Sequence, residues 1–155
     1  MRQPVTAYIA LGANLGDPAA ALCQAMDDLN QVNGITVTGR SSLYRTAPID
    51  SSGPDYVNAV VEITTQLTAP ALLAALQQIE NEAGRERPFI NAPRTLDLDV
   101  LLFGEAHVHS ARLEVPHPRM WARAFVLLPL AEIAPQRVSA AQLLAVRGQT
   151  ISRYC

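Results

Sequence analysis

The stretch TLDLDVLLF, residues 95–103, alternates polar and apolar side chains over its first half. An alternation with a period of two is typical of a β-strand with one apolar face. The residues expected on one face are Thr95, Asp97, Asp99 and Leu101, and those expected on the other are Leu96, Leu98, Val100 and Leu102. The sequence therefore predicts two carboxylates side by side on one face of a strand.

The N-terminal part of the chain predicts a strand followed by a helix. Residues 5–11 (VTAYIAL) are rich in β-forming residues and stop at the turn-forming GANLGD, residues 12–17. Asp17 can cap a helix, Pro18 suits its first position, and apolar residues then recur at helical spacing up to the break at Gly34.

The central part predicts two strands and a second helix before TLDLDVLLF. Residues 35–44 and 56–65 are rich in β-branched and aromatic residues, and a turn-rich loop separates them. A helix then starts near Thr68 and Pro70 and ends at Gly84.

The resulting order, βαββαβ, matches a ferredoxin-like α+β fold, in which two helices cover one face of an antiparallel sheet. From His107 onward we expect a C-terminal extension with a short strand and a helical segment at 121–128. A closing helix is expected where Ser139 and Gln142 form a capping box. The length of 155 residues fits one domain, 1–155, since about 100 to 200 residues is usual.

The charged residues exclude several functions. The chain has 12 basic and 14 acidic side chains, a formal net charge of −2, and every basic residue is an arginine. Without lysine there is no GxxxxGK[ST] phosphate loop, no protein-kinase strand lysine and no Schiff-base chemistry. The slightly negative balance argues against a broad nucleic-acid surface, which needs a basic face. We therefore expect no nucleic-acid partner.

The cysteines and apolar runs bear on localisation. Cys23 and Cys155 are too few for a disulfide framework or a CxxC metal site. The apolar run at 7–11 is too short for a signal-peptide core, and no stretch approaches the about 20 apolar residues of a membrane-spanning helix. We expect a cytoplasmic protein without a membrane partner.

Asp97 and Asp99 are the strongest candidates for chemistry. Aspartate is depleted in strands, and neighbouring like charges without a partner are destabilising. A divalent cation relieves this repulsion, and Mg²⁺ is often bound by one or two carboxylates together with substrate phosphates. The alternatives are a solvated sheet edge or carboxylates paired with nearby arginines.

Arginines gather around the two aspartates in the sequence. A guanidinium binds phosphate oxygens through two parallel hydrogen bonds, so several of them can clamp one polyanion. Taken singly, each is more often a surface residue or an ion-pair partner. The arginines concerned are Arg85, Arg87, Arg94, Arg112, Arg119 and Arg123.

Two further segments could contact a ligand. His117 lies between two prolines in VPHPRM and could donate a hydrogen bond to a phosphate oxygen, although a lone histidine is more often structural. The loop at 44–58 could read the edge of a flat heterocycle through backbone amides and the Asn58 carboxamide while Phe125 stacks on its face. Its composition alone favours an ordinary hairpin loop.

These motifs together resemble a known family. YIALGANLGD, YRTAP, PDYVNAVV, IENEAGRERPFINAPRTLDLDVLLF and RLEVPHPRMWARAFVLLPLAEIAP occur in order over residues 8–135. They closely resemble the 6-hydroxymethyl-7,8-dihydropterin pyrophosphokinase family of folate biosynthesis. The RTLDLD and VPHPRM segments together are highly specific, whereas GANLGD alone would be weak.

The resemblance implies that ATP gives its β,γ-diphosphate to the pterin hydroxymethyl group and leaves as AMP. It implies two Mg²⁺ ions bridged by Asp97 and Asp99, with catalytic roles for these aspartates and for Arg85 and Arg87. The implied ATP-binding residues are Gln77, Glu80, Arg85, Arg87, Arg94, Arg112, His117 and Arg123. The implied pterin-binding residues are Thr46, Ala47, Pro48, Ile49, Tyr56, Asn58, Asp97 and Phe125.

The chain departs from the usual family pattern at four places. Ala92 stands where glycine is usual, and Asn91 stands where many members carry tryptophan. Ala13 replaces the serine of a GSN turn, and Arg45 replaces the glutamate of YET. None of these positions is an aspartate of the pair, the histidine or a clamp arginine.

Two other functions also fit parts of the sequence. A non-catalytic ferredoxin-like module could sense a nucleotide or bind RNA, but an RNA-binding sheet usually exposes aromatic and basic residues rather than two aspartates. A phosphohydrolase could use the same metal pair. We expect a monomer that acts on the small molecules ATP and 6-hydroxymethyl-7,8-dihydropterin.

Overall fold

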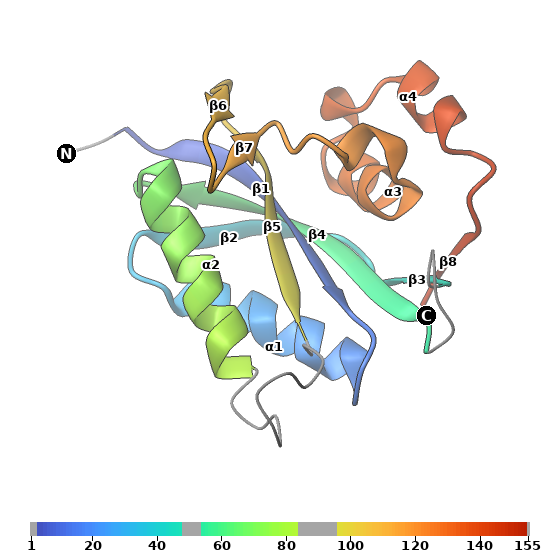
Figure 1. Ribbon diagram of the computed structural model, residues 1–155, viewed down its shortest axis with the longest axis horizontal. Coiled ribbons are helices and arrows are strands. Elements are labelled where there is room, and N and C mark those ends of the chain that lie inside the picture. The colour runs from blue at the N-terminus through green and yellow to red at the C-terminus, as the bar shows by residue number, and fades with distance from the viewer. Residues whose placement is uncertain (1–2, 48–53, 84–95, 155) are drawn as a thin grey trace.

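The computed structural model describes residues 3–47, 54–83 and 96–154 and contains a six-stranded antiparallel sheet (Figure 1). β1 lies between β5 and β4, and β5 forms one edge of the sheet. Beyond β4 lie β2 and β3, and β3 in turn pairs with β8. The strands are β1 (Val5–Ala13), β2 (Ile35–Arg40), β3 (Tyr44–Thr46), β4 (Tyr56–Thr65), β5 (Asp97–Phe103) and β8 (Ile151–Arg153).

Helices cover both faces of this sheet. On one face, α1 (Pro18–Gln31) and α2 (Ala69–Ala83) pack against side chains of β1, β4 and β5 and form the larger core. On the other face, α3 (Ala124–Ile133) packs against β3 and β4 (Figure 1). The two-helix layer and the antiparallel sheet confirm the ferredoxin-like α+β fold, and α3 adds a third layer from the C-terminal extension.

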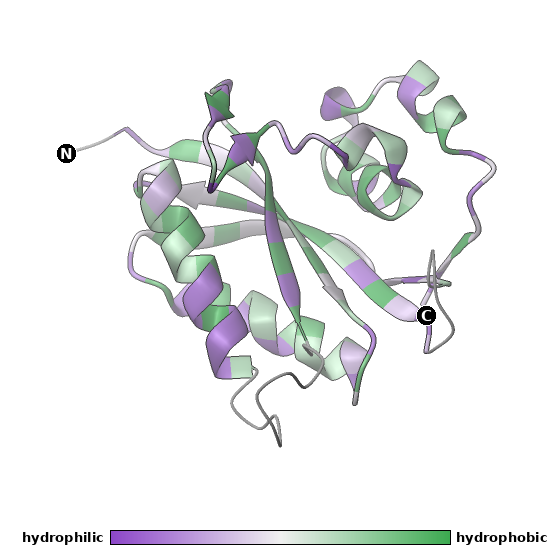
Figure 2. Cartoon of the chain, viewed as in Figure 1, coloured by the Kyte–Doolittle hydropathy of each residue, from purple (hydrophilic) through white to green (hydrophobic). Residues whose placement is uncertain are grey.

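Short elements complete the C-terminal extension. A hairpin pairs β6 (Val108–His109) with β7 (Glu114–Val115), and a 3₁₀ turn at Met120–Ala122 leads into α3. A second 3₁₀ turn at Pro135–Arg137 precedes α4 (Ala140–Ala145). Figure 2 shows α3 largely apolar around its circumference, which agrees with its position between the sheet and the segment that follows it.

The predicted helix caps are formed. The Asp17 carboxylate accepts a hydrogen bond from the Ala20 amide at 3.2 Å and so satisfies one of the free N–H groups at the start of α1. Ser139 and Gln142 make the expected capping box of α4, with bonds of 3.1 and 2.8 Å. In the part of the chain that the structure describes, no helix is both long and apolar enough to cross a bilayer.

The strict alternation predicted for β5 is wrong at Leu102. Val100 lies opposite Ile9 but Leu102 lies opposite Tyr8, so Leu101 is an extra residue in β5. Such a bulge reverses the sides on which the following residues lie. Leu102 therefore joins Leu101 on the α3 side of the sheet instead of packing against α1 and α2.

The single strand predicted at 35–44 is divided into β2 and β3. Ser41 causes the interruption, because its amide donates to the Val60 carbonyl and its hydroxyl accepts from the Val60 amide, both at 2.9 Å. The side chain thus takes one of the positions that a backbone carbonyl would hold in a regular ladder. The helical segment expected at 121–128 is likewise a 3₁₀ turn followed by a longer α3 that ends at Ile133.

Glu132 fixes α3 to the link between β2 and β3. Its carboxylate accepts hydrogen bonds from the Ser42 amide (3.0 and 3.1 Å), the Ser42 hydroxyl (2.8 Å) and the Tyr44 hydroxyl (2.7 Å). Partial burial by itself raises the pKa of Glu132, but these hydrogen bonds and the nearby Arg153 outweigh it and hold the pKa below its usual 4.5. The ionised carboxylate therefore stabilises the folded chain.

We expect Glu132→Gln to lower the free energy of unfolding at pH 7 by about 1 to 2 kcal/mol, since charge-assisted hydrogen bonds are lost. A carboxylate with a lowered pKa stabilises the fold above its unfolded pKa, and that stability disappears as the pH falls through the folded pKa. Urea unfolding from pH 7 to pH 3 should therefore show a smaller acid loss in the variant than in the wild type. Glu105→Gln, at an exposed ion pair with Arg137, is the matched control. Equal pH dependence in wild type and Glu132→Gln would contradict the assignment.

Candidate active site

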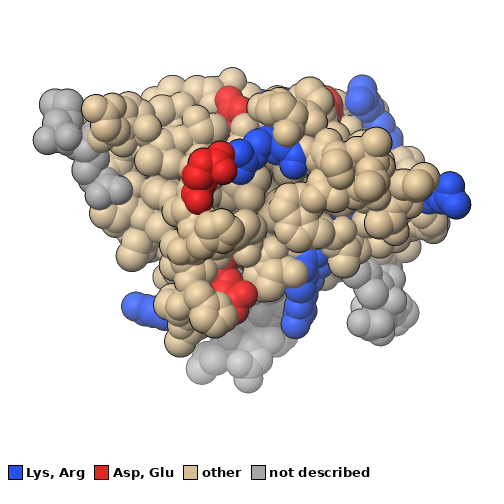
Figure 3. Space-filling view, turned by 90° about the horizontal axis from the view of Figure 1, so that it is seen from above, with Lys and Arg blue, Asp and Glu red and all other residues tan. Residues whose placement is uncertain are grey.

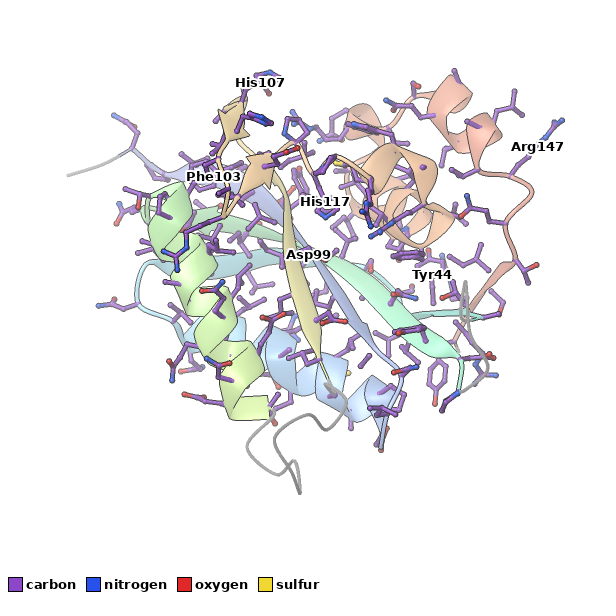
Figure 4. The ribbon with its side chains drawn as sticks, in the orientation of Figure 1. Tyr44, Asp99, Phe103, His107, His117 and Arg147 are labelled. Atoms are coloured by element: carbon purple, nitrogen blue, oxygen red, sulfur yellow. The ribbon has the colours of Figure 1, made fainter. Side chains whose placement is uncertain are left out.

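Asp97 and Asp99 lie on the face of the sheet that α3 partly covers. Both side chains are exposed, whereas Leu98 and Val100 between and after them pack into the core under α1 and α2. Leu101, on the same side as the aspartates, belongs to the core against α3. The predicted placement of two carboxylates on one strand face is confirmed, and Figure 4 shows Asp99 on β5.

The pairing of β1 with its two neighbours sets a row of residues across this face. Gly12 of β1 lies opposite Asp97 of β5 and opposite Asn58 of β4. A Cβ atom at Gly12 would lie 3.0 Å from Oδ1 of Asn58, closer than side chains normally approach. Glycine therefore keeps open the space between the Asp97 carboxylate and the Asn58 carboxamide.

Asn58 is held in one orientation. Its side chain is only 5% exposed, and its Nδ2 donates a hydrogen bond of 2.9 Å to Oγ1 of Thr46 on β3. The amide oxygen is thereby directed toward Gly12. Thr46 and Tyr56 are paired residues on β3 and β4, so three residues predicted to bind the pterin lie together at this end of the sheet.

His117 is attached to β5 close to the aspartates. Its amide donates to the Leu101 carbonyl at 2.9 Å, and its Nδ1 accepts from the Arg119 amide at 3.1 Å. Because Nδ1 is an acceptor, the ring proton of the neutral histidine lies on Nε2, which can donate to a ligand. Figure 4 shows His117 on the segment between β7 and α3.

The surroundings of His117 favour its neutral form. Burial lowers the pKa of His117 below its usual 6.5, and the charges of Arg123 and Arg119 lower it further. The Asp99 carboxylate and, more weakly, Glu114 act in the opposite direction. The lowering effects outweigh the others, so a neutral donor lies beside a carboxylate and two guanidinium groups.

Arg123 and Phe125 lie together at the start of α3. The Arg123 guanidinium carbon is 5.4 Å from the centre of the Phe125 ring, within the range of a cation–π contact. Both side chains are half-buried. The structure therefore places Arg123, which is predicted to bind ATP, in contact with Phe125, which is predicted to bind the pterin.

A hollow of about 210 Å³ lies between α2 and the β6–β7 hairpin. It brings together Gln77 and Arg112, which are far apart in the sequence and were both predicted to contact ATP. α2 and β7 each contact β5, so the hollow lies at the β5 edge of the sheet. Its lining residues are Pro70, Leu73, Ala74, Gln77, Val108, Ser110, Arg112 and Leu113.

Glu80 supports the strand that carries the aspartates. Its Oε2 accepts a hydrogen bond of 2.8 Å from the Leu98 amide, which lies between Asp97 and Asp99. This bond connects α2 to the edge strand at the height of the two carboxylates. Glu80 thus lies near the predicted metal ligands, because it binds the backbone of the strand that carries them.

Several predicted site residues lie outside the described residues. They are Pro48, Ile49, Arg85, Arg87 and Arg94. Ala47, which precedes them at the end of β3, is described and exposed. The departures Asn91 and Ala92 also lie outside the described residues.

The other two departures have structural explanations. Ala13 is 2% exposed and packs in the apolar core under α1 and α2, where a hydroxyl group would have to find a partner. The Arg45 guanidinium lies 4.9 Å from the centre of the Tyr154 ring, so it contacts the C-terminal segment beside β8. Arg45 therefore interacts away from the row formed by Asp97, Gly12 and Asn58.

The donor set of the two aspartates fits Mg²⁺. Successive residues on one strand face are about 6.5 to 7 Å apart, which leaves room for ions between and beside the carboxylates. Within residues 3–47, 54–83 and 96–154, no group of three or more His, Cys, Asp or Glu forms a complete metal site. A pair of carboxylate ligands suits an ion whose coordination substrate phosphates complete.

Gly12 is the residue of this site that the sequence analysis did not single out. Its importance comes from the register between β1, β4 and β5, which cannot be read from the turn-forming stretch GANLGD. A glycine at the end of a predicted strand was the available signal, because such a glycine often marks a close approach.

Paired carboxylates on one face of an antiparallel sheet, with a histidine and arginine side chains beside them, have the chemistry of an enzyme that handles phosphates. A profile of the 7,8-dihydro-6-hydroxymethylpterin-pyrophosphokinase (HPPK) family matches residues 8–135. The chain belongs to this family.

Relatives support this assignment. The chain is 50% identical over 131 residues to the 2-amino-4-hydroxy-6-hydroxymethyldihydropteridine pyrophosphokinase of Bacillus subtilis, covering 84% of this chain and 78% of that protein. It is 45% identical over 135 residues to the protein of the same name from Haemophilus influenzae, covering 86% and 84%.

Solved structures support the fold. The chain matches Plasmodium falciparum HPPK-DHPS, wild type with SDX-DHP, at a TM-score of 0.69 and 14% identity over 87% of this chain. It spans only 42% of that longer protein. The family membership makes the chain a pyrophosphokinase of hydroxymethyldihydropterin in folate biosynthesis, with ATP as its co-substrate.

For His117 we expect an Nε2–H tautomer at pH 7 and a pKa below 6.5, both measurable by ¹⁵N NMR of the metal-free protein. Asp99→Asn should lower this pKa further, because it removes the charge that favours imidazolium. Arg123→Gln should raise it. An Nδ1–H tautomer, or a pKa that neither substitution moves, would contradict this description.

Proposed function

We propose that diphosphoryl transfer takes place over the row of Asp97, Gly12 and Asn58. The observation that carries this proposal is the position of β5, with its two exposed aspartates, between the hollow beside α2 and the oriented Asn58 carboxamide. The hollow with Gln77 and Arg112 lies at its outer edge, and Asn58 lies two strands away on its inner side. A nucleotide in the hollow could then extend its phosphates across the aspartates toward a pterin beside Asn58.

Asp97 and Asp99 would hold two Mg²⁺ ions in this arrangement. When bound, such ions neutralise phosphate charge and lower the pKa of a coordinated hydroxyl group. The exposure of both carboxylates and their position on one strand face support this role. Their mutual repulsion decreases when cations bind, so metal and the negatively charged nucleotide should bind cooperatively.

The pterin is proposed to lie between Asn58 and the start of α3. The Asn58 amide oxygen, fixed through Thr46, can accept hydrogen bonds from the N–H groups of the heterocycle. Phe125 can stack on its flat face, and Tyr56 lies on the same side of β4 as Asn58. Ala47, Pro48 and Ile49 are proposed to complete this pocket.

His117 and Arg123 are proposed to bind the triphosphate from the α3 side. The Nε2–H of His117 donates, and because that nitrogen carries the proton, the neutral ring does not serve as a base there. The Arg123 guanidinium supplies two parallel donors and a positive charge for oxygens that gain charge as AMP leaves. Catalysis then depends on alignment and electrostatics rather than on a covalent intermediate.

Arg85, Arg87, Arg94 and Arg112 are proposed as the remaining phosphate ligands, with Gln77 and Glu80 on the nucleotide side. Arg85 and Arg87 belong to one loop of the sequence and are proposed to contact the phosphates as the site closes. We further propose a single-domain monomer that works in the cytoplasm, in keeping with its two cysteines, of which Cys23 is free and exposed.

The other candidate functions find less support. On the face seen in Figure 3 the basic side chains stand apart among uncharged and acidic residues, unlike a continuous RNA-binding surface. A phosphohydrolase would not need the orientation of Asn58 by Thr46. Incubation with ATP, Mg²⁺ and 6-hydroxymethyl-7,8-dihydropterin separates the possibilities, because pterin-dependent AMP is expected, whereas ADP with phosphate, or no turnover, would contradict the proposal.

Asp97→Asn and Asp99→Asn should each lower AMP formation at least about a thousandfold, since transition-state charge loses its main counterion. The substitutions keep the shape of the side chain and remove only charge, so circular dichroism should show an intact fold. Asp27→Asn, on α1 and paired with Arg40 at 3.1 Å, is the control and should retain activity. Near-normal AMP release by either site variant would contradict the metal-binding role.

Arg85→Ala should lower turnover by much more than it weakens ATP binding in the absence of pterin, because the residue is proposed to act on closure. Single-turnover kinetics and calorimetric ATP binding measure the two effects. Arg147→Ala, at an exposed arginine after α4, is the control (Figure 4). Equal losses of turnover and ATP affinity would make Arg85 a static ligand instead.

A further inference from the structure

Gln149 lies in the C-terminal segment, outside the residues matched by the family profile. Its side-chain amide makes two hydrogen bonds to the turn that begins α3. Oε1 accepts from the Ala124 amide at 2.8 Å, and Nε2 donates to the Ala122 carbonyl at 2.8 Å. Both ends of one carboxamide thus bind the two residues that flank Arg123.

The start of α3 needs such a partner. The first amides of a helix have no carbonyl within the helix to bind, and a side chain at the N-cap often satisfies one of them. Arg123 is the N-cap residue of α3 and makes no side-chain cap bond. Gln149 therefore supplies, from a distant segment, a partner for the amide of the first helical residue, Ala124, one of the free N–H groups at the start of α3.

The same C-terminal segment also binds β3, the strand that carries Thr46. Two residues after Gln149, Ile151 of β8 pairs with Thr46 of β3, and the Tyr154 amide donates to the Leu43 carbonyl at 2.7 Å. Two residues span at most about 7 Å, so the turn at Ala122–Ala124 and the end of β3 are tied together over a short distance. Thr46 in turn orients Asn58.

The geometry points to Gln149 as a positioning residue. By holding the backbone on either side of Arg123, it orients the side chains of Arg123 and Phe125 toward the substrates. This inference rests on the proposed placement of Arg123 and Phe125 at ATP and the pterin. Gln149 itself touches no reacting atom in this arrangement. Its loss should leave the fold intact and allow the turn to sample other conformations.

The single tryptophan of the chain reports on this turn directly. Trp121 precedes Ala122 in the 3₁₀ turn and packs partly against the core under α3. Acrylamide quenching of its fluorescence measures how often the turn opens, without substrates or metal. Gln149→Ala should increase quenching and lower kcat/KM about tenfold. KM for the pterin should rise even at temperatures well below the melting temperature of the variant, so that a general loss of stability does not explain the effect.

Gln149→Glu gives a signature that a general loss of stability would not. At pH 7 the glutamate keeps an acceptor for the Ala124 amide but turns a second oxygen toward the Ala122 carbonyl. Protonation restores a donor there, so quenching should return toward the wild-type level as the pH falls through the pKa of the introduced glutamate, which is about 4.3 for an unperturbed side chain. Neither the wild type nor Gln149→Ala should show this recovery.

Gln142→Ala is the matched control, because Gln142 makes the same kind of bond, to the Ser139 amide at 2.8 Å, without reaching the α3 turn. It should leave Trp121 quenching and kcat/KM near wild-type values. Unchanged quenching in both Gln149 variants would overturn the proposal. Increased quenching with unchanged kcat/KM would also overturn it, by showing that the turn moves without affecting the site, whereas the pyrophosphokinase activity itself would stand.

Discussion

The antiparallel register of β1 with β5 and β4 is the constraint on which the site depends. It places Gly12 between Asp97 and Asn58, so that a carboxylate, an open space and a fixed carboxamide follow one another across the sheet. A slip of one residue in the pairing of β5 with β1 would turn the aspartates into the core and the core leucines to solvent. The burial of Leu98 and Val100 therefore stabilises the position of the two exposed carboxylates between and beside them.

The fixed register places the two carboxylates of the site next to each other on an exposed face. Two carboxylates at neighbouring positions repel each other, and the surrounding chain does not remove that repulsion by burying them. It instead supplies a neutral histidine whose proton lies on Nε2, and a guanidinium packed on an aromatic ring. This combination is the basis for proposing that the site binds cations and phosphate together. The overall charge of −2 says little about this, because opposite charges are gathered at one place.

The sequence predicted those parts of the fold that local patterns determine. The alternation around Asp97 and Asp99, the Asp17 cap and the capping box at Ser139 each depend on residues close in the chain. Leu102 was assigned to the wrong face because the bulge at Leu101 arises from pairing with β1. The break at Ser41 depends on a hydrogen bond to Val60, which is distant in the sequence.

The parts of the site that could not be predicted from the sequence likewise depend on contacts between residues far apart in the chain. Gly12 matters only because of the strands on both sides of it, and Gln149 only because the chain returns to the start of α3. Gln77 and Arg112 were predicted through the family resemblance, while their meeting at one hollow follows from the packing of α2 against the β6–β7 hairpin. Sequence patterns and the family resemblance thus predicted the residues of the proposed chemistry, whereas their arrangement in space required the structure.

Asp97 and Asp99 are proposed to form a metal site that the phosphates of the nucleotide complete. Counting bound Mn²⁺ by electron paramagnetic resonance, with and without a non-hydrolysable ATP analogue, tests it most directly. We expect weak binding to the protein alone and two tightly bound ions per chain in the presence of the analogue. Two ions bound equally tightly without the analogue, or retained by Asp97→Asn and Asp99→Asn, would contradict it.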